Sequence, residues 1–347
     1  MRRIRNMGHS SPDSWPQRRR RLLHCGATKP DGRTTLTEQA LKGRVALITG
    51  GGRGMGREMA VAFARAGAAG VCITAAPGSD ETGDAIRTEL GEALAAIAAA
   101  GGRGLALTGD VGDWDNCQRV VAETVVTFGA LHILVNNAGK SGRYVATGGK
   151  RRVPFYEADP EGYCEVNRTN VDGPFLMARA AAAHMIVAGW GRIINISKNV
   201  DAMHAPDNSP YGPSKAALEA ATVAWAEDLF GTGVTVNSLG PGGAVNTRFG
   251  DGNLTGRGQP ADVMVPCALW LASAAADGVT GCRYTGNRWD PSLPADEAAE
   301  ACREPQIFPA PTRKTVLTLA WQPTGSGLPA GKAGTTQSVG TTKDTVS

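Results

Sequence analysis

Short apolar runs rich in β-branched residues alternate along this chain with longer helical patterns. The runs predict strands at residues 45–49, 71–74, 105–107, 131–135, 192–196, 234–239 and 282–285. The longer patterns predict helices at residues 57–66, 84–100, 170–185, 211–230 and 263–272, and one through Val120 and Val126. This alternation predicts an α/β fold with a doubly wound parallel sheet, in which ligands bind beyond the carboxyl ends of the strands.

Three segments follow from where this alternation begins and ends. Residues 1–41 are predicted to be a disordered basic extension, residues 42–290 one folded domain, and residues 291–347 a largely disordered extension in which regularity fades beyond Trp289. Residues 141–160 form a polar insertion without clear periodicity, which we expect to be a loop on the substrate side.

The basic excess of the chain is local. The first 43 residues carry a net charge of +7, so the rest of the chain sums to −3, which argues against a nucleic-acid-binding body. The basic segment could serve as a nucleic-acid or membrane tether, but an unfolded extension is the favoured interpretation. It has no apolar stretch typical of a signal peptide, and no run of about 18 apolar residues predicts a membrane span. Seven scattered cysteines without a C-x-x-C pair predict neither disulfides nor a metal site, and favour a cytoplasmic protein.

The segment Val45 to Gly56, VALITGGGRGMG, predicts a strand, a glycine turn and a helix in succession. Such a turn lets the backbone approach a diphosphate and aims the positive end of the next helix at its charge. A dinucleotide site is therefore predicted, although glycine turns also occur where a strand merely packs tightly on a helix.

The end of the second strand usually selects between the two nicotinamide cofactors. Thr74, Ala75 and Ala76 provide no carboxylate to hold the ribose hydroxyls of NAD, and Arg53 could meet a 2′-phosphate. NADP is thus favoured over NAD, with a solvated turn residue as the alternative for Arg53.

Polar residues also follow the next two strands. Asp110 could accept a hydrogen bond from an adenine amine, or it could be the N-cap of the helix through Val120. The sequence from Asn136 to Gly139, NNAG, offers small residues and amides that can run beside a bound cofactor.

Tyr211 and Lys215 are four residues apart at the predicted start of a helix, where Pro213 is tolerated. Both side chains then lie on one face, and an ammonium near a phenol favours the phenolate, so the pair can act as a general acid and base. Such pairs are also common on helix surfaces without any function.

Together, TGGGRGMG at 49–56, NNAG at 136–139, INIS ending at Ser197, YGPSK at 211–215 and PGG at 241–243 resemble the short-chain dehydrogenase/reductase family over residues 42–290. The resemblance implies a Rossmann-like subunit, NADP or NAD as cofactor, a small alcohol or carbonyl substrate, and a homodimer or homotetramer. By the same resemblance Tyr211 is the proton donor and acceptor, Lys215 binds the nicotinamide ribose, and Asn170 belongs to a proton relay. The cofactor positions it implies are Gly50, Gly52, Arg53, Gly54, Met55, Gly56, Asp110, Val111, Asn137, Ala138, Gly139, Tyr211, Lys215, Pro241, Gly242 and Thr247.

One departure from the family concerns the catalytic serine, usually thirteen residues before the tyrosine, where this chain has Lys198. Ser197 could reach the substrate through a one-residue shift, the ammonium of Lys198 could polarise the carbonyl instead, or the protein could bind cofactor and react poorly. The leading hypothesis is an oxidoreductase acting on a secondary alcohol or ketone; the alternative is a cofactor-binding protein with little turnover.

Two smaller departures follow. Thr247 lies one residue later after Pro241 than the family's threonine, and Asp290-Pro291 replaces the usual glycine-rich ending.

Overall fold

The structure is a computed structural model, and it describes residues 39–77, 82–146, 152–249 and 258–310. The expected disorder of residues 1–38 and 311–347 lies outside the described residues. All described elements belong to one compact unit.

The centre of that unit is a sheet with the strand order β3-β2-β1-β4-β5-β6-β7-β8. Strands β1 to β7 are parallel, and β8 runs antiparallel to β7. The strands are β1 Val45–Thr49, β2 Gly70–Ala75, β3 Gly104–Thr108, β4 Ile133–Asn136, β5 Gly191–Ile196, β6 Val234–Gly240, β7 Arg283–Thr285 and β8 Arg303–Glu304. This arrangement confirms the predicted doubly wound parallel sheet.

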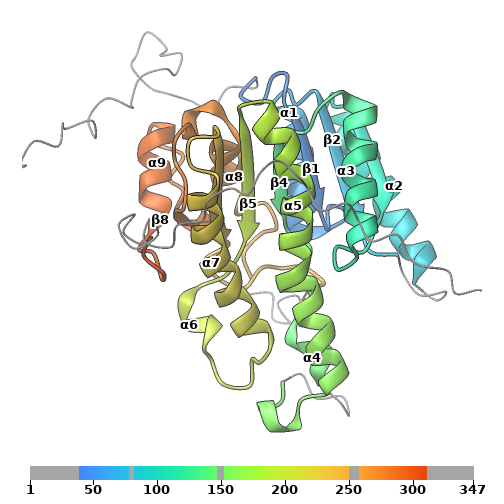
Figure 1. The fold of residues 1–347 in the computed structure, drawn as a ribbon, viewed down its shortest axis with the longest axis vertical. Helices are drawn as coiled ribbons and strands as arrows, with labels where there is room; N and C mark the ends of the chain where they lie inside the picture. Colours follow the sequence, from blue (N-terminus) through green and yellow to red (C-terminus); the bar gives the residue numbers. More distant parts are fainter. Residues whose placement is uncertain (1–38, 78–81, 147–151, 250–257, 311–347) are drawn as a thin grey trace, which may run out of the picture. The chain divides into compact units, whose positions relative to one another are not determined.

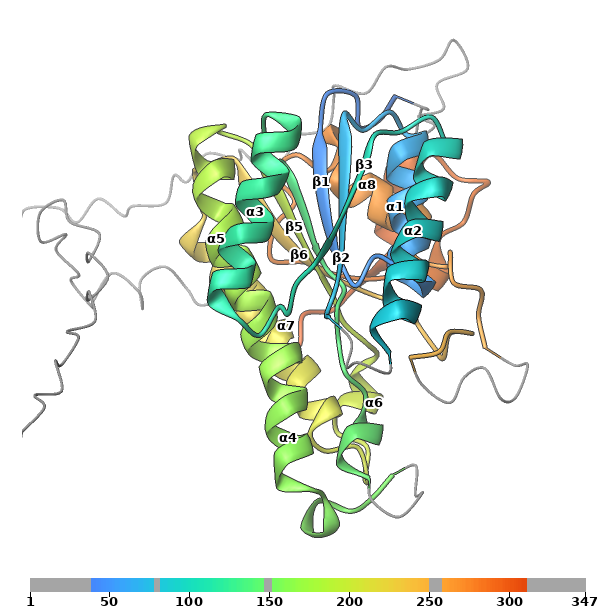
Figure 2. The ribbon, with the colours of Figure 1, turned by 90° about the vertical axis from the view of Figure 1, so that its right-hand side faces the viewer.

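Helices cover both faces of the sheet, as Figures 1 and 2 show. One face carries α1 Gly54–Arg65, α2 Gly83–Ala99, α8 Val265–Ala272 and α9 Ala295–Cys302. The other carries α3 Trp114–Phe128, α5 Gly173–Val187 and α7 Tyr211–Asp228. Strands β1 and β5 are buried along their whole length, because both their faces meet helices, and this explains their continuous apolar runs.

Beyond the carboxyl ends of the strands lie α4 Pro160–Asn167 and the short α6 Val200–Met203 (Figure 1). A wide π-helical turn, Arg168–Asp172, joins α4 to α5. The expected loop at 141–160 contains two 3₁₀ turns in its described part, at Gly142–Val145 and Phe155–Glu157.

Three expectations from the sequence need correction. The helix after the glycine turn begins at Gly54 rather than at residue 57, because Arg53 already takes the cap position. Leu41 is fully buried in the core, so the folded body begins before residue 42. Regular structure also continues past Trp289 into α9 and β8, where small buried side chains such as Ala298 gave little periodic signal.

Candidate active site

The glycine turn after β1 is too tightly packed for larger residues at two positions. A Cβ on Gly56 would lie 2.3 Å from the carbonyl oxygen of Gly50, and one on Gly51 would lie 2.7 Å from Ile73 Cγ2. Gly50 and Gly54 also have positive φ angles, of 64° and 53°. The start of α1 therefore packs directly on the turn, as a close approach to a diphosphate requires.

The first turn of α1 is left open for an anion. Its cap residue, Arg53, makes no side-chain hydrogen bond to the helix, and the first turn contains no acidic residue. Arg53 instead pairs with Glu89 of α2, its Nη1 lying 3.2 Å from the carboxylate. The N–H groups of Gly54, Met55 and Gly56 and the positive helix end thus fit the diphosphate of a dinucleotide.

Asn137 ties the end of β4 to this turn. Its Nδ2 donates to the carbonyl oxygens of Thr49 at 2.9 Å and Gly50 at 3.0 Å. The Thr49 hydroxyl accepts in turn from the backbone N–H of Asn137 and Ala138, both at 3.0 Å. The NNAG segment therefore fixes the shape of the glycine turn, and Gly139 follows beside Asn170.

Asp110 follows β3 at the same edge of the sheet. Its Oδ2 accepts from Arg168 Nη2 at 2.7 Å, and its Oδ1 accepts from the backbone N–H of Gly112 at 2.9 Å. The helix cap considered for it is supplied by Asp113, which accepts from Asn116 N at 2.8 Å. The neighbouring Val111 is buried. Asp110 is thus held by a cation from the π-helical turn, and its adenine contact stays a prediction.

Asn170 lies fully buried in the π-helical turn, a feature that often marks functional sites. Its Nδ2 donates to the carbonyl oxygen of Lys140 at 2.9 Å and to Ser214 Oγ at 3.0 Å. Its Oδ1 accepts from the backbone N–H of Lys140 at 2.7 Å. One amide thus links the segment after NNAG to the start of α7.

Tyr211 and Lys215 occupy the first and fifth positions of α7, as predicted. Lys215 Nζ donates to the carbonyl oxygen of Ile196 at 2.7 Å. Burial lowers the pKa of Lys215 to about 8, with the nearby charge of Lys198 adding to the effect. The expected lowering of the tyrosine pKa is wrong for this structure, because burial raises the pKa of Tyr211 to about 12.

Ser197 and Lys198, the two candidates for the position of the family's serine, have different surroundings. Ser197 Oγ is buried and has no hydrogen-bond partner among the described residues. Lys198 is half-buried, with its Nζ 4.5 Å from the centre of the Tyr211 ring. Burial lowers the pKa of Lys198 to about 8, and Arg152 lowers it further. Lys198 therefore contacts the ring of Tyr211.

The segment after β6 contacts both the glycine turn and Tyr211. Thr247 lies over the glycine turn, where its Cγ2 would be 3.2 Å from a Cβ on Gly54. The ring of Phe249 packs 5.7 Å from that of Tyr211, centre to centre. Arg248 Nη1 lies 2.8 Å from Glu89, so this carboxylate serves both Arg53 and Arg248. Sequence reasoning missed Glu89, Arg248 and Phe249, because no local pattern marks contacts between residues so far apart in sequence.

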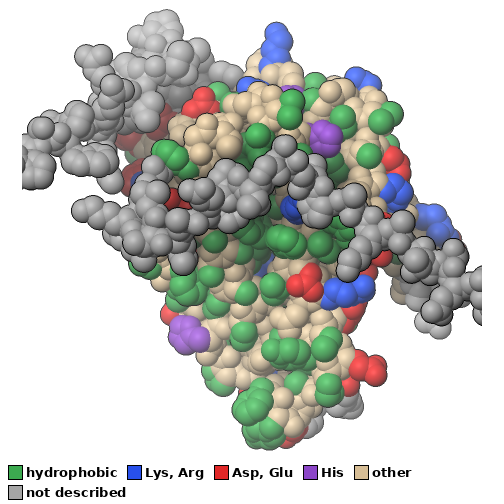
Figure 3. Space-filling model, viewed as in Figure 1, with side chains coloured by type: hydrophobic (Ala, Val, Ile, Leu, Met, Phe, Trp, Pro, Cys, Tyr) green, Lys and Arg blue, Asp and Glu red, His purple; other side chains and the backbone are tan. Residues whose placement is uncertain are grey.

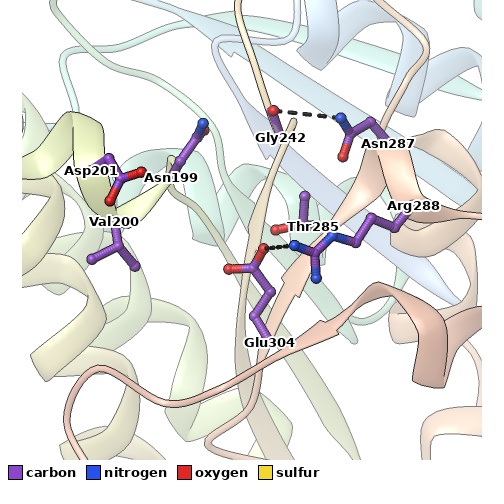
Figure 4. Close-up of a pocket in the computed structure, with 8 residues that line it drawn as sticks. All are labelled: Asn199, Val200, Asp201, Gly242, Thr285, Asn287, Arg288 and Glu304. Atoms are coloured by element: carbon purple, nitrogen blue, oxygen red, sulfur yellow. Dashed lines mark hydrogen bonds and ion pairs between the residues drawn. The ribbon is translucent and has the colours of Figure 1, made fainter.

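A cavity of about 340 Å³ begins one residue after Lys198 (Figure 4). One side comes from the start of α6, and another carries the ion pair between Arg288 and Glu304, 3.2 Å apart. Gly242 closes against Asn287, whose Oδ1 stands 2.0 Å from where a Cβ on the glycine would be. Tyr211, Lys215 and the glycine turn do not line this cavity, so it lies beside Lys198 without enclosing the pair on α7.

Comparison with known proteins gives one family. The family model for short chain dehydrogenases matches residues 44–254, more than half of the chain. The chain belongs to the short-chain dehydrogenase/reductase family. It is therefore an NAD(P)-dependent oxidoreductase that acts on an alcohol or the corresponding carbonyl compound.

Three similar proteins illustrate the relationship. A short-chain type dehydrogenase/reductase of Picea abies is 33% identical over 60% of this chain and 73% of its own length. A cis-4-hydroxycyclohexanecarboxylate dehydrogenase of Sinomonas cyclohexanicum is 30% identical over 66% of this chain and 82% of its own. A gluconate 5-dehydrogenase of Burkholderia cenocepacia, solved with NADP and tartrate, is 30% identical with a TM-score of 0.61, over 72% of this chain and 97% of its own.

Within the part of the chain that the structure describes, no helix combines the length and apolarity needed to cross a bilayer.

Proposed function

We propose that this short-chain dehydrogenase/reductase interconverts a ketone and a secondary alcohol, with Tyr211 as the general acid and base. The observation that carries the proposal is the meeting of three elements at one edge of the sheet. Tyr211 and Lys215 from α7, Asn170 from the π-helical turn and the open end of α1 all lie at the carboxyl ends of the strands.

The state of Tyr211 suits it to donate a proton. A phenol with a pKa near 12 is neutral at physiological pH, so it can protonate the oxygen of a carbonyl that is being reduced. The bound NAD(P)H supplies the hydride for the carbon of that carbonyl. Lys215 lies one helical turn away and can stabilise the phenolate that remains.

Asn170 is the positioning residue of this arrangement. It bonds Lys140 on one side and Ser214 on the other, and so holds the chain after Gly139 against the first turn of α7. A resupply of protons to Tyr211 through this buried amide and Lys215 is the role that the family resemblance gives to Asn170.

For the cofactor, we propose a preference for NADP. Thr74, Ala75 and Ala76 at the end of β2 provide no carboxylate to hold ribose hydroxyls, and Arg53 stands at the start of α1. Arg53 and Arg248 share one carboxylate, Glu89, so a 2′-phosphate placed here meets two guanidinium groups and only one acid. The NADP-bound gluconate 5-dehydrogenase is consistent with this preference.

We also propose that the protein is a homo-oligomer. The outer surface of α5 exposes Phe175, Ile186 and Val187, the last with 90% of its surface accessible. Hydrophobic side chains appear among polar ones on the face that carries α5 and α7 (Figure 3). A second copy packed on this face would remove them from water.

The test is NADPH oxidation by the purified full chain against a panel of ketones and oxo acids, together with Tyr211→Phe. Loss of the phenolic proton should lower kcat by about 10²- to 10⁴-fold, while the Kd for NADPH, followed by its fluorescence, stays unchanged. Tyr163→Phe, an exposed tyrosine on α4, is the matched control. Turnover that survives in Tyr211→Phe would refute the assigned role, and binding of NADPH with no turnover in any variant would support the low-activity alternative.

A further inference from the structure

The ammonium of Lys198 stands inside the candidate active site without a counter-charge. It lies 4.5 Å from the centre of the Tyr211 ring, on a side chain that is half-buried. Among the residues that the structure describes, no carboxylate pairs with it and no carbonyl oxygen accepts from it. A partly buried cation without a counter-charge lowers the stability of the folded protein, unless a ligand of opposite charge binds it.

Two acids of the candidate site already have cationic partners. Glu165 pairs with Lys140 and, at 3.1 Å, with Arg168. Glu219, buried in α7, lies 3.3 Å from Arg283. Neither carboxylate can therefore neutralise Lys198 without giving up an existing partner.

Further positive charge makes the imbalance larger. Arg152 is close enough to lower the pKa of Lys198, and Lys198 in turn lowers that of Lys215. Lys198 thus lies beside Tyr211 with positive charge acting on it from Arg152 and with its own charge acting on Lys215, and an oxidised nicotinamide would add a further positive charge.

From this cluster we infer that the substrate carries a carboxylate close to the reacting carbon, and that Lys198 binds it. The inference rests on the proposed function, since it takes Tyr211 as the group that contacts the reacting oxygen. The substrate is then a 2- or 3-hydroxy acid, oxidised by loss of a hydride and a proton to the oxo acid, or the oxo acid reduced by their gain.

The geometry limits where the carboxylate stands on the substrate. The ammonium of Lys198 lies 4.5 Å from the centre of the ring that carries the phenolic oxygen, so one small molecule can contact both groups. A carboxylate one or two bonds from the carbonyl can therefore bond Lys198 while the carbonyl oxygen bonds Tyr211. A lysine supplies a compact single charge with three donors, which matches one carboxylate in a charge-assisted hydrogen bond.

The test compares pyruvate with methyl pyruvate, two probes with the same ketone that differ in the charge of the neighbouring group. Their binding to the full chain without added cofactor is measured by calorimetry near pH 7, for the wild type, Lys198→Gln and Lys198→Arg. Lys42→Gln, an exposed lysine at the start of the fold, is the control for loss of one positive charge.

Pyruvate should bind wild type about 10- to 100-fold more tightly than Lys198→Gln, as expected for loss of one charge-assisted hydrogen bond. Lys198→Arg should recover part of this affinity, and Lys42→Gln should bind pyruvate like wild type. The affinity for methyl pyruvate should be the same in wild type and in all three variants. Equal affinity of wild type and Lys198→Gln for pyruvate would overturn the inference, whether or not the variant keeps its fold by circular dichroism.

Turnover separates this inference from the proposed function. In the reductase assay the preference for pyruvate over methyl pyruvate should fall by the same factor in Lys198→Gln, through KM rather than kcat. If Tyr211→Phe remains active while Lys198 still selects the acid in the calorimeter, the proposed function fails and the anion site stands. If neutral ketones are reduced as well as the acids, through Tyr211, the anion site fails and the proposed function stands.

Discussion

Arg283 and Lys198 are neighbouring cations that the chain treats in opposite ways. Arg283, at the start of β7, is 98% buried and is surrounded by acceptors: Glu219 at 3.3 Å, Glu304, and the carbonyl oxygen of Lys198 at 2.8 Å. Lys198 is held through that carbonyl, yet its own ammonium has no acid beside it within the described parts of the chain. Two carboxylates thus pair with the arginine, and none of the described carboxylates pairs with the lysine.

The difference separates a structural cation from one that can serve a ligand. A buried charge that only joins elements must be neutralised by the protein itself, because nothing else reaches it. A charge that faces a reaction space can remain without a partner if a substrate brings the opposite charge. Lys198 follows the end of β5 and Arg283 begins β7, on either side of β6, and the two residues are joined by a hydrogen bond, so their contrast arises within one small region of the sheet.

The largest effect on stability is expected when Arg283 loses its partner Glu219. Glu219→Ala should lower the free energy of unfolding by about 3 to 5 kcal/mol, because it leaves the guanidinium of Arg283 buried with an incomplete set of partners. It also removes the acceptor of the Ser238 hydroxyl, now 2.7 Å away. Urea denaturation at one fixed protein concentration measures the change.

The matched control is an exposed ion pair. Glu300→Ala breaks the contact of Glu300 with Arg303, 3.5 Å long and with 71% of the glutamate side chain accessible. It should change the free energy of unfolding by no more than about 0.5 kcal/mol. Equal losses in Glu219→Ala and Glu300→Ala would mean that Arg283 does not depend on its acid.

The two kinds of site also differ in how far sequence could predict them. The glycine turn, the strands and the pairing of Tyr211 with Lys215 on one helix follow from local patterns, and fold, family, enzyme class and nicotinamide cofactor are all confirmed. The residue roles in the site stay predictions. Spacing along the chain correctly brings Tyr211 and Lys215 onto one helix, because helical geometry is local.

Contacts between distant segments could not be predicted in this way. Arg283 meets Glu219 across 64 positions of sequence, and no period or motif links them. The pKa of Tyr211 was expected to fall because a lysine lies one turn away, but burial by the surrounding segments raises it instead. Local spacing identifies which groups can interact, whereas burial decides how they titrate.

A smaller effect on stability, opposite in sign to that of Glu219→Ala, is expected when the charge of Lys198 is removed. Lys198→Met keeps the length of the side chain but ends its repulsion of Lys215, so the free energy of unfolding should stay equal to that of wild type or rise by about 1 kcal/mol. Arg283→Met is the counterpart, and should destabilise because it leaves Glu219 without its cation. A loss of more than about 2 kcal/mol in Lys198→Met would show that the lysine is structural after all, in the same sense as the arginine.

The smallest effect is the pH dependence of the difference in free energy of unfolding between Lys198→Met and the wild type. The pKa of Lys198 is lowered from its ordinary 10.5 to about 8 in the folded protein, so below pH 8 both states hold the proton and its destabilising effect is present in full. Between about pH 8 and 10.5 the unfolded chain retains a proton that the folded chain has lost, and stability therefore rises with pH. The groups that act on it, Arg152 and Lys215, are also positive, so they reinforce this direction.

The stability advantage of Lys198→Met over wild type should therefore be greatest near pH 7 and shrink as the pH rises through 8 toward 10. Tyr211, with its pKa raised to about 12, lowers stability above pH 10, but it is present in both proteins and largely cancels in the difference. Urea denaturation of the two proteins in parallel from pH 7 to 10 measures the difference directly. A difference that stays constant over this range would mean that the ammonium of Lys198 keeps its proton as an exposed lysine does, and the contrast with Arg283 would then lie in geometry alone.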